Sequence, residues 1–160
     1  MEIQPTIQYL VSKKLIGLRT ETSLVNNKTG QLWQSFMPRR KEIIKRVNKD
    51  FISMQIYDPT YFDDFNPAKT FEKWATVEVT DFNNIPPEME TYILEAGNYA
   101  VFNYKGSSTD NSIFEYIFST WLPNSDYSLD DRPHFEILGE KYKNADLNSE
   151  EEIWIPIKKR

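Results

Sequence analysis

Two stretches decide the fold class: Arg132-Pro133-His134-Phe135-Glu136-Ile137-Leu138 and the closing Glu151-Glu152-Ile153-Trp154-Ile155-Pro156-Ile157. Both are rich in aromatic and β-branched residues and are bounded by proline, glycine or acidic residues, so each is predicted to be a short strand. Successive side chains of a strand point to opposite faces, which places His134, Glu136 and Leu138 together on one face. Glu136 is therefore either an exposed carboxylate or a group that faces a cavity.

The rest of the chain alternates predicted strands with two helical segments. Strand patterns cover residues 7–11, 15–22, 51–57, 71–79, 89–94 and 99–105. Helical spacing of apolar residues predicts one helix over residues 31–47, kinked at Pro38, and another that runs from Thr109 or Asp110 to Pro123. Residues 124–131 are predicted to form a loop, and residues 149–152 a solvated turn that protects a sheet edge. These elements predict an α+β fold.

The second half of the chain repeats the plan of the first. Tyr9-Leu10-Val11 matches Tyr92-Ile93-Leu94, and Ile16-Gly17-Leu18 matches Tyr99-Ala100-Val101, both at a shift of 83 residues. We therefore expect one domain over residues 1–160 with half repeats at about 5–82 and 88–158. Two similar halves would pack about a pseudo-twofold axis, where a ligand cleft is expected. The alternative is the incidental self-similarity of any α+β chain.

Size and charge exclude several classes of protein. A chain of 160 residues with 39% hydrophobic and 27% charged residues is typical of one globular domain. A net charge of −5 gives the chain as a whole no electrostatic footprint for nucleic acid, and the cluster Arg39-Arg40-Lys41 is predicted to lie on a solvated helix face. No apolar run reaches membrane-spanning length and the N-terminus lacks a signal peptide pattern, so a cytoplasmic protein without a membrane partner is expected.

Composition also limits the chemistry. The absence of cysteine excludes disulfides and thiolate sites, and the single histidine, His134, makes a multi-histidine metal site or a catalytic triad implausible. The pairs Asp63-Asp64 and Asp130-Asp131 lack the spacing of a calcium loop. We therefore expect no metal and no cofactor. The aromatic content of 14% is high, and it suits either a large core or the lining of a pocket for organic ligands.

Five segments together resemble the GyrI-like small-molecule-binding family, whose domain is also the effector-binding part of AraC-type and MerR-type transcription activators. They are Leu32–Pro38, Ala96–Phe102, Trp121–Pro123, Asp131–Glu136 and Glu152–Ile157. The resemblance implies tandem SHS2-like βαββ modules, an antiparallel sheet with helices packed on it, and a central cleft. It also implies multidrug-type binding of lipophilic, often cationic, aromatic compounds. Because the resemblance begins within the first ten residues, it implies a stand-alone form without a DNA-binding helix-turn-helix.

Glu136 matches the buried glutamate of that family. A carboxylate in an apolar pocket has a raised pKa, and a cationic ligand would relieve the cost of its burial. Aromatic side chains would add cation–π attraction. The candidates for this lining are Trp33, Trp74, Tyr104, Trp121, Phe36 and Trp154. For these aromatics the core is the alternative, and for Glu136 an exposed or ion-paired position.

The leading functional hypothesis is a module that binds small hydrophobic or cationic molecules, for sequestration or for sensing in transcription regulation. The alternative is a hydrolase of reactive xenobiotics in which Glu136 acts as general base, with Tyr104 or another tyrosine as hydrogen-bond donor. A third hypothesis is inhibition of a protein such as gyrase through a surface that includes Arg39, Arg40 and Lys41. Ligand identity and protein partner are left open by the sequence.

Overall fold

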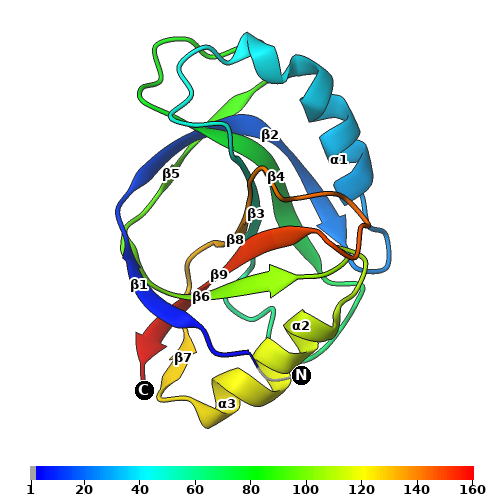
Figure 1. The fold of residues 1–160 in the computed structure, drawn as a ribbon, viewed down its shortest axis with the longest axis vertical. Helices are drawn as coiled ribbons and strands as arrows, with labels where there is room; N and C mark the ends of the chain where they lie inside the picture. The colour runs from blue at the N-terminus through cyan, green and yellow to red at the C-terminus, as the bar shows by residue number, and fades with distance from the viewer. Residues whose placement is uncertain (1–2) are drawn as a thin grey trace.

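The computed structural model describes residues 3–160, so Met1 and Glu2 of the predicted domain lie outside the described residues (Figure 1). Within this range the strands are β1 (Thr6–Leu10), β2 (Lys13–Ser23), β3 (Phe51–Ile56), β4 (Thr70–Val79), β5 (Glu90–Leu94), β6 (Gly97–Lys105), β7 (Tyr127–Leu129), β8 (His134–Leu138) and β9 (Glu150–Lys159). Helix α1 (Thr29–Phe36) continues into a 3-10 helix, Met37–Glu42. Helix α2 (Ser112–Tyr116) continues through a π-helical turn, Ile117–Trp121, into α3 (Leu122–Asn124). The predicted α+β class is confirmed.

The sheet is antiparallel and has the order β1-β6-β9-β8-β3-β4-β2-β5, with β7 beside β9. The order is symmetric about its centre. Exchanging β1 with β5, β2 with β6, β3 with β8 and β4 with β9 gives the same order read from the other end. The first strand of each half is therefore donated to the other half, since β1 pairs with β6 and β5 pairs with β2. The centre of the sheet is the β3–β8 pair, where the two halves meet.

Strand pairing corrects the shift between the two halves. Leu10 pairs with Gly97 just as Leu94 pairs with Lys13, and a shift of 84 residues carries one pair onto the other. The 83-residue shift read from the sequence would exchange the two faces of each strand, because side chains alternate. Tyr9, for example, is 67% exposed, whereas Tyr92 packs against the core. The motif match of these two tyrosines is therefore not a structural equivalence.

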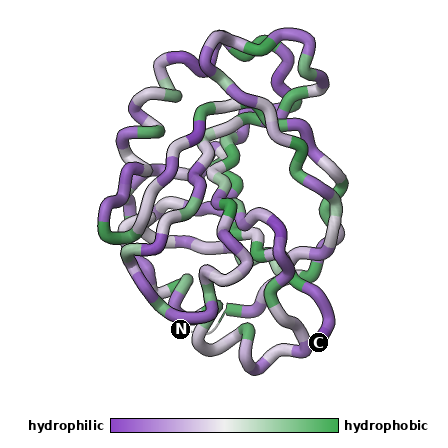
Figure 2. The backbone as a smooth tube through the Cα atoms, turned by 180° about the vertical axis from the view of Figure 1, so that it is seen from behind, coloured by the Kyte–Doolittle hydropathy of each residue, from purple (hydrophilic) through white to green (hydrophobic). Residues whose placement is uncertain are grey.

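The two faces of the sheet are covered differently. Both helices lie on one face, where α1 packs over β2 and β4 and α2 packs over β6 and β9, leaving β3 and β8 between them. The opposite face forms a core of its own, whose buried members are Leu10, Leu15, Ile52, Met54, Trp74, Leu94, Tyr99, Val101, Phe135 and Trp154. Figure 2 shows the hydrophobic segments concentrated on the strands and the hydrophilic ones on the peripheral loops.

Three local predictions are wrong. The first helical segment ends at Glu42 and not at residue 47: the 3-10 turn begins beside Pro38, Ile43 is already extended, and Ile44 and Val47 are exposed. Residues 124–131 include the short strand β7. Residues 150–152 begin β9 in the interior of the sheet, because Glu151 pairs with Tyr104 and Glu152 with Ile137, so they are not an edge-protecting turn.

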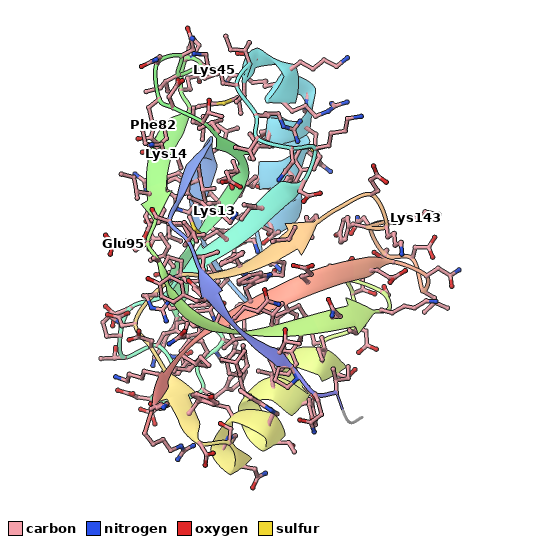
Figure 3. All side chains as sticks on the ribbon, turned by 60° about the vertical axis from the view of Figure 1, so that its left-hand side comes forward. Lys13, Lys14, Lys45, Phe82, Glu95 and Lys143 are labelled. Atoms are coloured by element: carbon pink, nitrogen blue, oxygen red, sulfur yellow. The ribbon has the colours of Figure 1, made fainter. Side chains whose placement is uncertain are left out.

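The molecule carries charged residues on two opposite sides. Figure 3 shows Lys13, Lys14 and Glu95 on the side of β2 and β5, and Lys143 on the opposite side, in the loop that joins β8 to β9. Lys13 pairs with Glu78 at 3.1 Å. No helix between residues 3 and 160 is long and apolar enough to cross a membrane.

Candidate functional site

Glu136 lies at the centre of the molecule, in the middle of β8 and opposite Ser53 of β3. The side chain of Gln55 donates its amide nitrogen, Nε2, to both carboxylate oxygens of Glu136, at 3.1 and 2.9 Å. Lys73 of β4, which pairs with Gln55, places its Nζ 3.9 Å from Oε1 of Glu136. Glu136 and Lys73 are only 9% and 6% exposed, so the carboxylate is not a solvated strand residue.

Burial and charge act in opposite directions on this pair. Burial raises the pKa of Glu136, and the nearby Lys73 ammonium partly offsets that shift. Burial lowers the pKa of Lys73, while the carboxylates of Glu136 and Glu151 act to raise it. A charge in this position depends on its partner, because an isolated buried charge would be costly.

Glu151 belongs to the same group, although it is not among the site residues predicted from the sequence. It lies on β9 two residues before Ile153, the cross-strand partner of Glu136, and so faces the same side of the sheet. Burial raises the pKa of Glu151 to about 7, the Glu136 carboxylate adds to the shift, and Lys73 opposes it. The alternation of Glu151, Ile153 and Ile155 was the available signal for this position, but residues 149–152 were assigned to a solvated turn.

Aromatic rings gather around His134, next to Glu136 on the same face. Phe62 stacks on His134 at a centroid distance of 5.4 Å and an interplanar angle of 14°, and its ring also stacks on Phe118 at 5.2 Å and 27°. Tyr57 meets His134 edge-on at 4.9 Å. Tyr61 and Phe71 contact Tyr57 and complete an aromatic cluster, defined here as Tyr57, Tyr61, Phe62, Phe71, Phe118 and His134.

The titratable side chains of this cluster are neutral around pH 7. Burial lowers the pKa of His134 to about 3, so its imidazole is uncharged and serves as a flat ring. Burial, reinforced by the charge of Glu136, raises the pKa of Tyr57. Phe62 is held by the segment between β3 and β4, and it is 41% exposed. The aromatic spotting of residues 57–65 was the available sequence signal for this cluster.

The structure separates the aromatic residues predicted to line the site. Trp74 and Trp154 lie on the opposite face of the sheet from Glu136, in the core that contains Phe135, so their assignment to the same cleft is corrected. Alternation explains this, because Trp154 pairs with Phe135 while Glu136 pairs with Ile153. The two tryptophans make equivalent hydrogen bonds, since each donates its indole N–H to the glutamate two residues before it.

The other predicted aromatics lie on the helix-covered face. Trp33 and Phe36 meet edge-on at 5.7 Å, and both contact Phe51, which lies two residues before Ser53 on the same side of β3. Trp121 packs on Phe102 at 5.2 Å, under α2. Tyr104 is the cross-strand partner of Glu151, and its hydroxyl donates to the carbonyl of Ser107 at 3.0 Å.

Two hollows of about 180 and 650 Å³ lie elsewhere on the surface. The smaller is lined by Glu21, Thr22, Ser23, Asn26, Lys28 and Thr70. The larger is lined by Ser112, Glu115, Tyr116, Ser119 and Thr120, along α2. Neither includes Glu136, which is covered by its neighbours in this structure.

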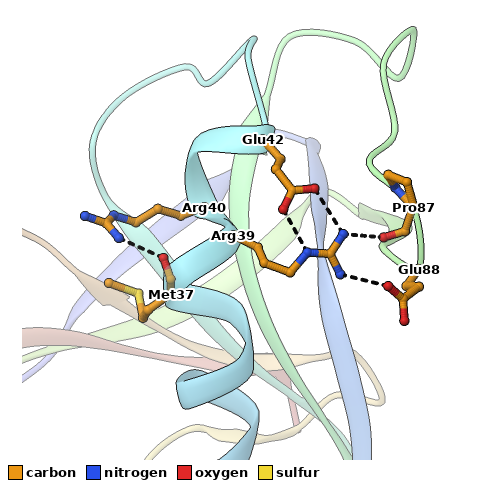
Figure 4. A network of polar contacts seen from close by, with 6 residues as sticks. All are labelled: Met37, Arg39, Arg40, Glu42, Pro87 and Glu88. Carbon is orange, nitrogen blue, oxygen red and sulfur yellow. Dashed lines mark hydrogen bonds and ion pairs between the residues drawn. The ribbon is translucent and has the colours of Figure 1, made fainter.

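The remaining charged candidates are occupied by local contacts. Arg39 donates to Glu42, to Glu88 and to the carbonyl of Pro87, and Arg40 donates to the carbonyl of Met37 (Figure 4). Asp130 accepts a bond of 2.8 Å from Arg132. In the part of the chain that the structure describes, no group of three or more His, Asp or Glu side chains is arranged to hold a metal ion.

Comparison with known proteins gives one family and several relatives. A family model described as GyrI-like small molecule binding domain matches residues 3–158. The transcriptional regulator BrlR of Pseudomonas aeruginosa is 27% identical over 145 residues, which cover 89% of this chain and 51% of BrlR; the chain thus spans about half the length of this curated relative. The EcmrR C-terminal domain shares the fold with a TM-score of 0.75 at 13% identity, covering 100% of both chains. SAV2435 bound to tetraphenylphosphonium gives a TM-score of 0.67 at 18% identity, covering 99% of this chain and 94% of the other.

Proposed function

The chain belongs to the GyrI-like family of small-molecule-binding domains, and we propose that it binds lipophilic aromatic cations at Glu136. The observation that carries the proposal is the buried Glu136 carboxylate beside a cluster of neutral rings. A ligand cation would stabilise the charged form of Glu136, whose pKa burial raises. The rings would supply flat apolar contact, with cation–π attraction of about 0.5–2 kcal/mol where a ring faces the charge.

The aromatic cluster suggests where a flat ring would lie. Phe62 already stacks between His134 and Phe118, and it is the most exposed of the three rings. A ligand ring in its place would keep both stacking contacts while the segment between β3 and β4 moves outward. We also propose that Trp33 and Phe36, which both contact Phe51, are neighbours of the site. Tyr104, the cross-strand partner of Glu151, is proposed as another neighbour. Trp121 is proposed only as support for α2.

We propose that this binding serves sensing or sequestration. The relative BrlR is a transcriptional regulator, and SAV2435 was solved with a lipophilic aromatic cation. Effector binding in transcription regulation is thus one proposed context for this chain, and capture of multiple toxic cations is the other. Both contexts require the same binding reaction.

Titration calorimetry with tetraphenylphosphonium tests the proposal. Glu136→Gln keeps the shape of the side chain and removes its charge, so we expect at least a tenfold loss of affinity, about 1.4 kcal/mol. Glu140→Gln changes an exposed glutamate just after β8 and is the matched control, with unchanged affinity. Equal affinity of the Glu136→Gln variant and the unsubstituted protein would refute the role of Glu136.

Hydrolysis is a second candidate, favoured by the two neighbouring carboxyl groups with raised pKa. Glu136 as general base would take a proton from water, the hydroxide would attack an ester carbonyl, and the alcohol would leave with that proton. Release of a chromogenic alcohol from aryl esters, lost in Glu136→Gln, is the expected result. Absence of turnover with cation binding intact would eliminate this candidate.

A further inference from the structure

Lys73 is a buried cation that a site for cations does not require. Its side chain is 8% exposed, and its Nζ lies 3.9 Å from the Glu136 carboxylate. It pairs across the sheet with Gln55, the residue that holds both oxygens of Glu136. A charge held at this depth interacts strongly with a charged ligand nearby, because the effective dielectric constant inside a protein is low.

Glu151 supplies the second negative charge. It faces the same side of the sheet as Glu136, whereas its neighbours Glu152 and Glu150 contact Trp154 and Lys141. Gln55 adds an unmatched acceptor: it is 7% exposed, and its Oε1 has no donor among the described residues. When all three groups are ionised, two carboxylates and one ammonium leave this group one positive charge short of balance.

We propose that Lys73 and Glu151 determine ligand charge, so that the site selects monocations over neutral molecules and dications. This inference rests on the proposed function. With Lys73 in place, the ionised group carries a net charge of −1, which one ligand charge neutralises. A second ligand charge would be buried without a partner, and such burial is costly.

Matched planar compounds provide the probes: methylphenylpyridinium with one charge, methyl viologen with two, and uncharged phenylpyridine at alkaline pH. The unsubstituted protein should prefer methylphenylpyridinium to both of the others in calorimetry at pH 8. Lys73→Met removes the resident cation, and we expect the affinity ratio of dication to monocation to rise roughly tenfold to a hundredfold. Lys73→Arg keeps the charge and should keep the original preference.

Glu151→Gln provides an independent variant. At pH 8 it should weaken methylphenylpyridinium binding by roughly tenfold and leave phenylpyridine binding unchanged. The unsubstituted protein should bind the monocation more tightly as pH rises through about 7, and this variant should lose the part of that dependence centred near pH 7, while any part due to Glu136 remains. The titratable groups that face Glu151 are Glu136 on β8, Lys73 on β4, Tyr104 on β6 and Tyr142 before β9. Both tyrosines have a raised pKa and stay neutral in this range.

The outcomes separate this inference from the proposed function. If Glu136→Gln abolishes monocation binding but Lys73→Met and Glu151→Gln leave the preference for charge unchanged, the inference fails and the proposed function stands. If the unsubstituted protein binds neither cation, both fail. Circular dichroism of each variant establishes whether it is folded. If Lys73→Met does not fold, the Glu151→Gln variant provides the test, and unchanged monocation affinity of that variant overturns the inference.

Discussion

Phe135 and Glu136 are neighbours on β8, and they lie on opposite faces of one sheet in opposite kinds of environment. Phe135 is fully buried and stacks on Trp154 at 5.2 Å in an apolar core. Glu136 is buried beside Lys73, Gln55 and Glu151, which have to be removed from water for the domain to fold. The face with Phe135 is an apolar core, whereas the helix-covered face combines apolar packing under the helices with a buried charged group between them, where we propose that a ligand binds.

The largest expected effect is on the apolar face. Phe135→Ala should lower the free energy of unfolding by about 3–5 kcal/mol, because it leaves a cavity against Tyr99 and Trp154. Chemical denaturation followed by tryptophan fluorescence measures this change. A loss below about 1 kcal/mol would mean that this face is not the main source of stability.

The next effect belongs to the polar face and depends on pH. Folding raises the pKa of Glu151 from 4.5 to about 7, so the folded state keeps a proton that the unfolded chain has released in this range. The resulting stability is complete below pH 4.5 and is lost as pH rises through about 7. His134 acts in the opposite sense: its pKa falls from 6.5 to about 3, and its contribution is lost as pH falls from 6.5 toward 3.

Glu151→Gln should remove the pH dependence of stability that is due to Glu151 and leave the pH dependence that is due to His134. Relative to the unsubstituted protein, the variant should gain about 2–3 kcal/mol between pH 4.5 and 7. Denaturation series across this range provide the measurement. Glu150→Gln alters the neighbouring, more exposed carboxylate and is the control; the same gain there would assign the slope to general surface charge.

The smallest expected effect tests whether the apolar face of the sheet is independent of the site around Glu136. Trp74→Phe removes the indole hydrogen bond to Glu72 while keeping an aromatic ring in the core, so it should cost about 1 kcal/mol of stability. Cation affinity should stay within twofold, because Trp74 lies behind the sheet relative to Glu136. A tenfold loss of affinity would return Trp74 to the site.

Patterns of alternation predicted much of this arrangement. The strand around Glu136, the shared face of His134 and Glu136, and the α+β class follow from local spacing, and all are present in the structure. The exchange of β1 and β5 between halves was not predictable, because strand pairing depends on contacts far apart in the sequence. The predicted equivalence of Tyr9 and Tyr92 was off by one residue, which is enough to reverse the faces.

The site was harder to predict than the fold. Glu136 could be identified as a candidate, but Lys73 and Glu151 resemble ordinary charged residues until the sheet brings three distant strands together. Trp74 and Trp154 attracted attention by their size, and strand alternation places them behind the sheet. Phe62 was overlooked because it lies in the segment between β3 and β4, and its packing on His134 and Phe118 depends on contacts far apart in the sequence.

The donation of a first strand by each half also determines how the protein can be made. β1 is synthesised before its partner β6, and the rest of the first half and β5 are made between them. The first half in turn lacks β5 as the edge partner of β2 until that time. Neither sheet half can be completed during synthesis of the N-terminal part: β1 stays unpaired until residue 101 is available to pair with Thr6, and β3 keeps an open edge until β8 is synthesised.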